Sequence, residues 1–550
     1  MSKVNKSSDT SASRKFPAMY SKIDIWQART ARMLFILMCC AMPIFLVNGY
    51  YELPTQKWEF FIFSMVLTLL SVALVWVYRL TRRTKLLPMG KPDISDWAII
   101  GFAAVTILVT LASPFRNDMS IWVGIPTNPG IAVGRYDGAI TQLFFVAIFF
   151  IISRWYKPRE KDFMWFSITA IAISIIGILQ FFGLDFLGLW PNYGANVRKH
   201  FFDIHLRTTL GNTNTVSVFV TVAVLFTGFL YIRKKSKWQP LWFAASAFSF
   251  WMWDVANADS GTIGIAVAML LCIPFIIQSS KTLGRTLILV SAWVATFTIQ
   301  TALFGTNLLN LRQINDFAAA GGLHLRPLSS LLPFLAVFAV LLAVGLLLNF
   351  KGKELDPDAP PKWKLGVILI VVCILVGIVG VEFLGRPDAD GHGSGVIFEA
   401  REIMHGNIQD NFGTYRIFIW RNALNAFPNN PIIGTGPDTF ALAFPAEAQV
   451  AAGGDYQFFE NAHNEYIQYL ITHGIVGLLF YLAFVISIVV RSVKKAFNDP
   501  ILMAVLAAFV GYLAQAFFNI SHPIASQMFW VFAGILLSRR LSEDGKFEVL

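Results

Sequence analysis

Long apolar runs separated by short polar segments extend along most of the chain. Many of the runs are close to 20 residues, the length that an α-helix needs to cross the hydrocarbon core of a bilayer. Charged residues or clusters of Pro, Gly and Asn end them. The pattern predicts an all-α polytopic membrane protein with about 12 to 14 transmembrane helices. The predicted spans are centred near Leu37, Thr68, Val105, Ala147, Ala172, Ala223, Phe248, Met269, Trp293, Val337, Cys373, Phe484, Phe509 and Val531.

Composition agrees with this fold class. Hydrophobic residues make up 56% of the chain and charged residues only 14%, whereas about 25% of the residues in soluble domains are charged. The four cysteines all lie in predicted spans, so the sequence does not predict a disulfide framework.

The basic residues are distributed unevenly between the two sides of the predicted topology. If the N-terminus is cytoplasmic, most of the 44 Lys and Arg residues lie on the cytoplasmic side. The positive-inside rule therefore predicts that both termini are cytoplasmic. The net charge of +11 then reflects topology. We expect the lipid bilayer and not nucleic acid as a partner, because the basic residues are scattered over short segments.

The predicted topology contains one long hydrophilic segment on the outer side. Its length argues for a function, since loops beyond about 12–15 residues are usually functional or disordered. Apolar residues have helical spacing over Ser394–His405 and Thr414–Phe427, and the second helix would carry Arg416 and Trp420 on one face. The predicted parts are a basic cytoplasmic tail (1–32), eleven helices with short loops (33–385), the large extracytoplasmic loop (386–468), three further helices (469–538) and a cytoplasmic tail (539–550).

The candidate chemistry lies in these outer segments. Arginine binds phosphate through its planar guanidinium, and a neutral histidine can take a proton from a hydroxyl. Arg416 and His463 in the large loop would therefore suit transfer from a phosphate-activated donor. Arg207 precedes the predicted start of the sixth span, where a helix N-terminus favours an anion. Arg135 begins another outer motif at the fourth span.

In order and spacing, five motifs between Arg135 and Leu479 resemble the O-antigen ligase and polymerase superfamily. They are Arg135-Tyr136-Asp137-Gly138, Arg207-x-x-x-Gly211-Asn212-x-Asn214, Arg416-x-x-x-Trp420, Pro431-x-x-Gly434-x-Gly436, and His463-Asn464-x-Tyr466 followed by Gly474-x-x-Gly477-Leu478. The resemblance implies a C-type glycosyltransferase-like fold in the bacterial cytoplasmic (inner) membrane. It also implies transfer of a glycan from a polyprenyl-diphosphate donor to an acceptor hydroxyl on the outer face, with inversion and without a metal or other cofactor.

The same resemblance implies the residue roles. His463 would be the catalytic base, and Arg207, Arg416 and Arg135 would bind the diphosphate. Supporting roles would fall to Asn464, Tyr466, Asn212 and Trp420. Each main role has a plain structural alternative. Arg416 could pair with Glu402 or Asp410, His463 could cap or pack a helix, and Glu460 or Glu465 could be the base.

Two other function classes stay open from the sequence. A transporter or flippase of lipid-linked sugars would also be polytopic, although it should carry charges within its spans. A metal-dependent glycosyltransferase would need acidic ligands in the first outer loop, where Val47–Lys57 contains Glu52 but no Asp. The acceptor could be a lipid-anchored sugar, a carrier-linked repeat or a protein hydroxyl.

Overall fold

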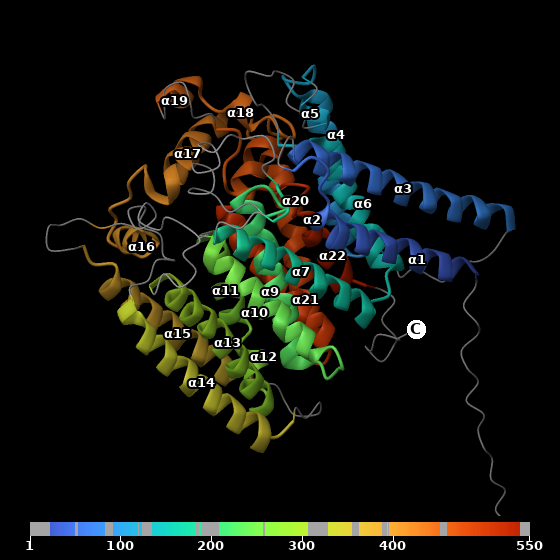
Figure 1. The fold of residues 1–550 in the computed structure, drawn as a ribbon. Helices are drawn as coiled ribbons and strands as arrows, with labels where there is room; N and C mark the ends of the chain where they lie inside the picture. Colours follow the sequence, from blue (N-terminus) through green and yellow to red (C-terminus); the bar gives the residue numbers. More distant parts are fainter. Residues whose placement is uncertain are drawn as a thin grey trace, which may run out of the picture.

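The fold is entirely helical in the part of the chain that the structure, a computed structural model, describes (Figure 1). Arg207 lies outside that part. The described residues are 22–49, 53–82, 92–118, 120–123, 135–182, 186–189, 208–256, 259–305, 328–354, 362–387, 393, 395–451 and 459–538.

Nine helices among the described residues are long and apolar enough to cross a membrane. This confirms a multi-pass membrane protein, and every predicted span centre lies in a helix. The nine are α3 (Leu53–Arg82), α4 (Ile94–Ala112), α7 (Glu160–Phe181), α9 (Thr213–Arg233), α13 (Ser280–Gly305), α14 (Leu331–Lys351), α15 (Trp363–Leu384), α20 (Glu465–Ala496) and α21 (Pro500–Gln515).

The remaining predicted centres lie in helices that do not meet this length and hydropathy. The first of them is broken into three parts by a π-helical segment, and three others are short. These helices are α1 (Lys22–Ile36) with η1 (Leu37–Ala41) and α2 (Met42–Ile44), α6 (Ala139–Trp155), α10 (Gln239–Ala256), α11 (Asp259–Leu271) and α22 (Gln527–Leu536).

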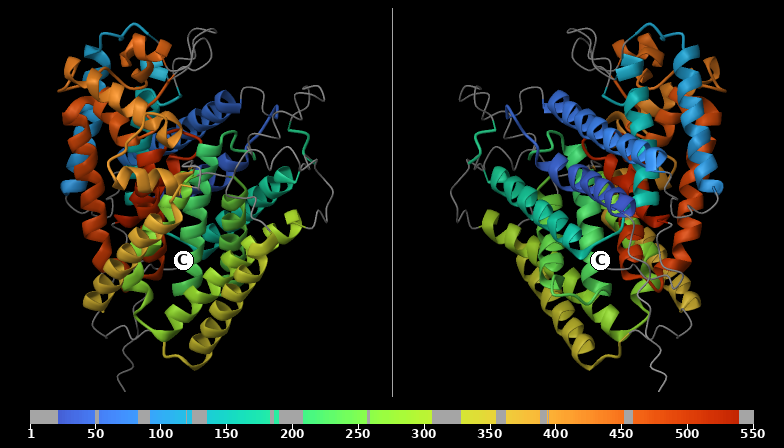
Figure 2. Two further views of the ribbon diagram at one scale, coloured as in Figure 1. Left: turned by 90° about the vertical axis from the view of Figure 1, so that its left-hand side faces the viewer. Right: turned by 90° about the vertical axis from the view of Figure 1, so that its right-hand side faces the viewer.

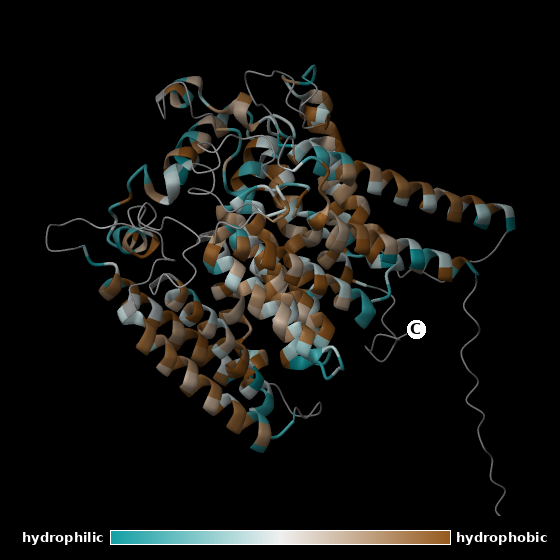
Figure 3. Cartoon of the chain, viewed as in Figure 1, coloured by the Kyte–Doolittle hydropathy of each residue, from teal (hydrophilic) through white to brown (hydrophobic). Residues whose placement is uncertain are grey.

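The helices differ sharply in how far their neighbours cover them. The apolar window of α9 is 94% buried, and that of α21 is 72% buried. The windows of α14 and α15 are 6% and 0% buried, so these helices present their Leu, Val and Ile side chains outward. Figure 3 shows hydrophobic residues along the middle of these helices, which matches a surface that faces lipid.

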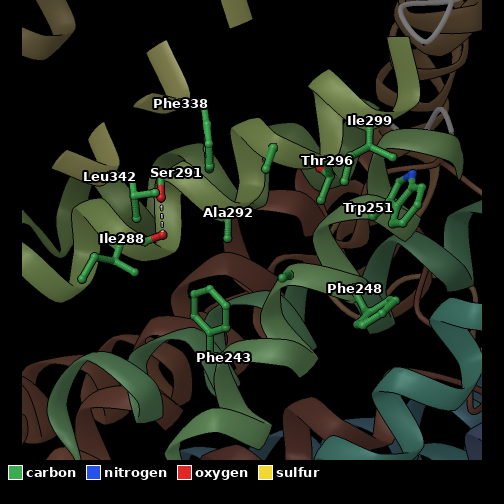
Figure 4. A pocket seen from close by; sticks show the side chains of 12 residues that line it. Phe243, Phe248, Trp251, Ile288, Ser291, Ala292, Thr296, Ile299, Phe338 and Leu342 are labelled. Atoms are coloured by element: carbon green, nitrogen blue, oxygen red, sulfur yellow. Dashed lines mark hydrogen bonds between the residues drawn. The ribbon is translucent and has the colours of Figure 1, made fainter. Parts of the chain in front are cut away.

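An apolar groove lies between α10, α13 and α14. It is lined entirely by residues of these three helices. Figure 4 shows the rings of Phe243, Phe248 and Trp251 from α10 and of Phe338 from α14 around it, and small residues such as Ala292 leave the space between them. Because the groove lies along predicted spans, it is at the depth of the hydrocarbon.

The described residues of the segment predicted as the large extracytoplasmic loop are folded. Its elements from Phe412 to Ala451 lie at one end of the molecule in Figures 1 and 2, and a small apolar core that includes Ile419, Phe440 and Ile471 joins them to α20. Both helices predicted in the loop are confirmed. The elements are α16 (Val396–Met404), α17 (Phe412–Ala426), η5 (Phe427–Asn429), α18 (Phe440–Ala443) and α19 (Ala446–Ala451).

The glycine motifs mark a close crossing of two backbones. The main chain at Thr435 and Gly436 donates hydrogen bonds of 3.1 and 2.8 Å to carbonyls of α20 at Ile471 and Thr472. Gly434 and Gly474 have φ of 72° and 64°, and a Cβ on Gly434 would lie 2.5 Å from the nitrogen of Gly474. Only glycine fits both the conformation and the space. The crossing holds the loop against the outer end of α20.

Candidate active site

The segment Asn461–Asn464, which we call the His463 turn, leads directly into α20. The side chain of Asn464 caps the helix, because its Oδ1 accepts the N–H groups of Tyr466 and Ile467 at 3.0 and 3.1 Å. The N–H of His463 donates to Oδ1 of Asn461 at 2.9 Å. His463 itself has a φ of 46°, in the left-handed region that non-glycine residues rarely adopt. This cap fixes the turn.

A tryptophan from α17 holds the same turn. The indole N–H of Trp420 donates to the carbonyl of Ala462 at 2.9 Å. The N–H of Ala462 in turn donates to Oε1 of Gln468 at 2.9 Å. Both main-chain polar groups of the residue before His463 are therefore engaged, so the position of the histidine is well determined.

His463 and Arg135 line one small polar cavity. Four separate chain segments contribute to it, and nearly all of the lining side chains are polar. The lining residues are Arg135, Asp137, Asp438, Asn461, His463, Asn464, Gln468, Asn519, Ile520 and Ser521.

A buried carboxylate organises the Arg135 side of the polar cavity. Oδ2 of Asp438 accepts the backbone N–H groups of Arg135 and Asp137, at 2.7 and 3.3 Å. Burial raises the pKa of Asp438 to about 7, although the two N–H groups and the charge of Arg135 oppose the rise. The guanidinium of Arg135 forms an ion pair with Glu460. Burial raises the pKa of Glu460 as well, against the opposing effect of Arg135.

The imidazole of His463 is neutral at ordinary pH. Burial lowers its pKa most, and together with the positive charges of Arg416 and Arg135 it brings the pKa to about 3. Both arginines therefore act electrostatically on the histidine. Nδ1 of His463 is buried and has no hydrogen-bond partner among the described residues.

Arg416 lies at the start of the regular part of α17. Gly413, Thr414 and Tyr415 before it have left-handed φ values of 62°, 56° and 65°. Nη1 of Arg416 donates to the carbonyl of Gly413 at 2.6 Å and to Oγ1 of Thr414 at 2.9 Å. Three consecutive residues with left-handed φ thus fix the backbone from which the Arg416 side chain extends. Backbone strain of this kind is common at functional sites.

The two acids proposed as structural partners of Arg416 have other partners. Asp410 forms an ion pair with Arg421 at 2.7 Å, and Glu402 forms one with Arg401 at 3.0 Å.

Residues 328–482 match the family described as O-antigen ligase. We call this segment the O-antigen ligase domain, after the family that it matches. It contains Arg416, Trp420, His463 and Asn464, and the family implies glycan transfer with lipid-linked glycan substrates. No curated protein matches the chain.

Other segments complete the polar cavity around the O-antigen ligase domain. Asn212, as expected, caps α9, with its Oδ1 accepting the N–H of Asn214 at 2.7 Å. The carbonyl of Asn214 accepts a hydrogen bond from Nδ2 of Asn519 at 3.0 Å, and Asn519 lines the cavity. The first turn of α9, which follows Arg207 in the sequence, is therefore hydrogen-bonded to a residue that lines the polar cavity.

Two residues of the O-antigen ligase domain that follow His463 have packing roles. The hydroxyl of Tyr466 donates to the carbonyl of Leu513 at 2.9 Å. The carboxylate of Glu465 is buried and accepts hydrogen bonds from the hydroxyls of Tyr481 and Tyr512, at 2.7 and 2.9 Å.

Several residues that line the cavity had no role predicted from the sequence. Asp137 lies inside a motif that we had singled out, and Asn461 lies two residues before another, so the neighbouring motifs were a usable signal. Asp438 lies two residues after the glycine motif, and its short polar side chain tolerates the left-handed φ of 57° that the turn requires. Asn519 and Ser521 follow α21 with no motif around them, and nothing in the sequence indicated them.

Proposed function

We propose that the protein transfers an oligosaccharide or polysaccharide from a polyprenyl-diphosphate donor to an acceptor hydroxyl. The reaction would take place on the outer face of the bacterial cytoplasmic membrane, with both termini in the cytoplasm. The observation that carries the proposal is a buried neutral imidazole, His463, within the electrostatic reach of Arg416 and Arg135 in an O-antigen ligase domain.

His463 is the base in this proposal. A neutral imidazole can accept the proton of the attacking hydroxyl, and its Nδ1 has no partner in the described structure. The competing carboxylates are already engaged. Glu460 is paired with Arg135, and Glu465 accepts hydrogen bonds from two tyrosines.

Arg416 and Arg207 bind the diphosphate leaving group. Its negative charge grows as the glycosidic bond breaks, so fixed cations stabilise the transition state more than the ground state. Arg135 contributes a positive charge that Glu460 partly offsets. We therefore expect Arg135 to position the polar cavity as well as to attract the donor.

The proposed reaction is a single displacement. The acceptor oxygen bonds to the anomeric carbon from the side opposite the diphosphate, whose bond to that carbon breaks. The electron pair leaves with the diphosphate and the hydroxyl proton passes to His463. A single displacement inverts the anomeric centre, and no metal takes part in any step.

The direct experiment is transfer by the purified protein in lipid nanodiscs, with a polyprenyl-diphosphate glycan, candidate acceptors, and chelator present or absent. We expect His463→Ala to reduce transfer by about 10²–10⁴-fold, the usual contribution of a general base. The matched control is His405→Ala, which removes a histidine at the end of α16 that contacts Glu382. It should transfer at nearly the wild-type rate.

Three outcomes would count against parts of the proposal. Undiminished transfer by His463→Ala would exclude this histidine as the base, and loss of transfer with chelator would show a metal requirement. Movement of the donor across a proteoliposome membrane without any transfer would instead support the transporter alternative.

A further inference from the structure

The apolar groove between α10, α13 and α14 presents carbon to its occupant, because its few polar side chains are already hydrogen-bonded. The hydroxyls of Ser291 and Thr296 each donate to a main-chain carbonyl of α13, both at 2.7 Å, and Figure 4 shows the first of these bonds. The indole N–H of Trp251 donates to Oε1 of Gln300 at 2.9 Å. Such walls suit an alkyl chain and disfavour a polar ligand.

The groove has the length of one leaflet of a bilayer. Along α13 it extends from Ile288 to Ile299, which is about 16 Å at the rise of an α-helix. Half of the hydrocarbon core of a bilayer is about 15 Å thick. Ile299 is 43% exposed, and the third wall belongs to α14, whose apolar window is only 6% buried. A lipid chain can therefore reach the groove from the side.

Three cations gather around one carboxylate at the ends of these helices. Oε1 of Glu354, just after α14, lies 2.8 Å from Nζ of Lys235 in the turn between α9 and α10. The same oxygen lies 3.1 Å from Nζ of Lys281 and 3.7 Å from Nη2 of Arg285, both in α13. The hydrogen bond from Lys235 holds the pKa of Glu354 below its ordinary value, so this carboxylate is ionised. The three cations, which we call the basic cluster, still keep a net positive charge.

The basic cluster adjoins one end of the groove. Arg285 lies one helical turn before the groove residue Ile288 on α13. Its Nη1 also donates to the carbonyl of Ile232 at 3.3 Å, which fixes the guanidinium at the ends of the helices. The side chains of Lys235 and Lys281 are 67% and 26% exposed, so a second anion can approach them. The positive-inside rule predicts that this end is cytoplasmic.

An amphiphile with an alkyl chain and an anionic head matches both features. We propose that the groove and the basic cluster bind an anionic phospholipid of the cytoplasmic leaflet, with an acyl chain in the groove and the phosphate on Lys235 and Lys281. Basic pockets between helices on this side of a membrane suit such headgroups. The polyprenyl-diphosphate donor fits less well, because under the proposed function its diphosphate binds on the outer face. The lipid site goes beyond that function and does not depend on it.

The first test measures lipid binding to the purified protein in detergent micelles by native mass spectrometry. Phosphatidylglycerol and phosphatidylcholine are added at equal concentrations. Wild-type protein should bind phosphatidylglycerol about 5- to 25-fold more tightly, since each basic residue near an anionic headgroup contributes roughly fivefold. Lys235→Gln combined with Lys281→Gln should remove most of this preference. The matched control is Lys494→Gln with Lys495→Gln, which removes the same charge from the last turn of α20 and should keep the preference.

The second test fills the groove. Ala292→Trp places a large ring in the space that Ala292 leaves open, so binding of both lipids should fall by roughly tenfold or more. Loss of contact with two methylene groups is enough for an effect of this size. Val340→Trp is the control, because this position on α14 is 61% exposed and does not line the groove. Melting temperatures show whether each variant is folded, and the lysine variants decide the proposal if Ala292→Trp is not.

Four outcomes would overturn the proposed lipid site. Wild-type protein could bind both lipids equally, or the two lysine pairs could have equal effects, and the attraction would then be a general effect of surface charge. Inorganic phosphate could compete with phosphatidylglycerol at similar concentration, which would reduce the site to an ion site. Polyprenyl diphosphate could displace phosphatidylglycerol, which would assign the groove to the donor. None of these measurements requires glycan transfer, so the lipid site and the proposed function can fail separately.

Discussion

The indole N–H of Trp420 donates a 2.9 Å hydrogen bond to the carbonyl of Ala462, the residue before His463. Trp420 lies one helical turn after Arg416 on α17, so the two side chains share a face of the helix. One short helix therefore connects the proposed diphosphate ligand to the turn that holds the proposed base. The relative position of the two groups depends on this hydrogen bond.

Trp420→Phe should slow transfer without weakening donor binding. The substitution removes the N–H donor but keeps a ring that can pack on Phe518, whose centroid lies 5.9 Å away. A hydrogen bond contributes about 0.5–1.5 kcal/mol, so kcat should fall roughly 2- to 10-fold. The measurement is kcat at saturating donor. The control is Trp122→Phe, which removes a weaker indole hydrogen bond of 3.4 Å to Arg116. Equal effects of the two variants would contradict the role of Trp420.

The helices were predictable from sequence because a segment in hydrocarbon must satisfy its backbone hydrogen bonds internally. How far neighbouring helices bury each of them was not predictable from the sequence. The windows of α9 and α14 have mean hydropathies of 2.2 and 2.9, yet 94% of one and 6% of the other is buried. Lipid is as apolar as a leucine-rich neighbouring helix, so composition hardly separates a lipid-facing helix from a central one.

The site was predictable only where its residues form local motifs. Arg416, Trp420, His463 and Asn464 lie within short patterns whose chemistry can be read directly. The contact between Asp438 and the backbone of Arg135 joins positions 303 residues apart, and no spacing rule connects them. The polar cavity, which brings Asp137 and Asn461 together, includes that contact and therefore required the structure.

Gly474→Ala should strongly destabilise the protein. Gly474 has a φ of 64°, and a Cβ there would lie 2.6 Å from the nitrogen of Ile433, so strain and collision combine. Gly377→Ala is the control, because nothing lies within 4 Å of a Cβ at that position in α15. Gly474→Ala should lower the melting temperature in detergent by several degrees or prevent folding, whereas Gly377→Ala should leave it equal or slightly higher. Similar melting temperatures for both would show that the crossing with residues 431–436 is not tight.

Asp438→Asn should change how stability depends on pH. Folding raises the pKa of this carboxyl from 3.8 to about 7, so the folded protein holds its proton more tightly than the unfolded chain. The resulting stabilisation is fully present below pH 3.8 and is lost as the pH rises through 7. Because a single oxygen of Asp438 accepts both N–H groups, an Asn amide oxygen can replace it.

The stability of the wild-type protein should therefore fall more steeply between pH 4 and about 7 than that of Asp438→Asn, as measured by melting temperature. Asp410→Asn is the control, since Asp410 is 45% exposed in its ion pair with Arg421. If all three proteins have the same slope, the carboxyl of Asp438 does not titrate in this range.

The pH dependence of transfer should reveal the effect of Arg416 on His463. A base is lost when it is protonated, so its activity falls as the pH drops through its pKa. Burial and the charges of Arg416 and Arg135 hold the pKa of His463 at about 3 in the free protein. The profile of kcat/KM for the donor, which reports the free enzyme, should therefore show no loss from this residue between about pH 5 and 8.

Binding of the diphosphate donor should change the pH dependence that His463 causes. Its negative charge offsets the two arginines, so the pKa of His463 should rise in the donor complex. The acid limb of kcat, which reports the complex, should then lie at higher pH than that of kcat/KM. Arg416→Gln should move the acid limb of kcat/KM upward, because it removes a charge that lowers the pKa. Arg421→Gln, on the same helix but paired with Asp410, should leave the limb in place. Coincident limbs in the wild type and Arg416→Gln would show that Arg416 does not act on the base.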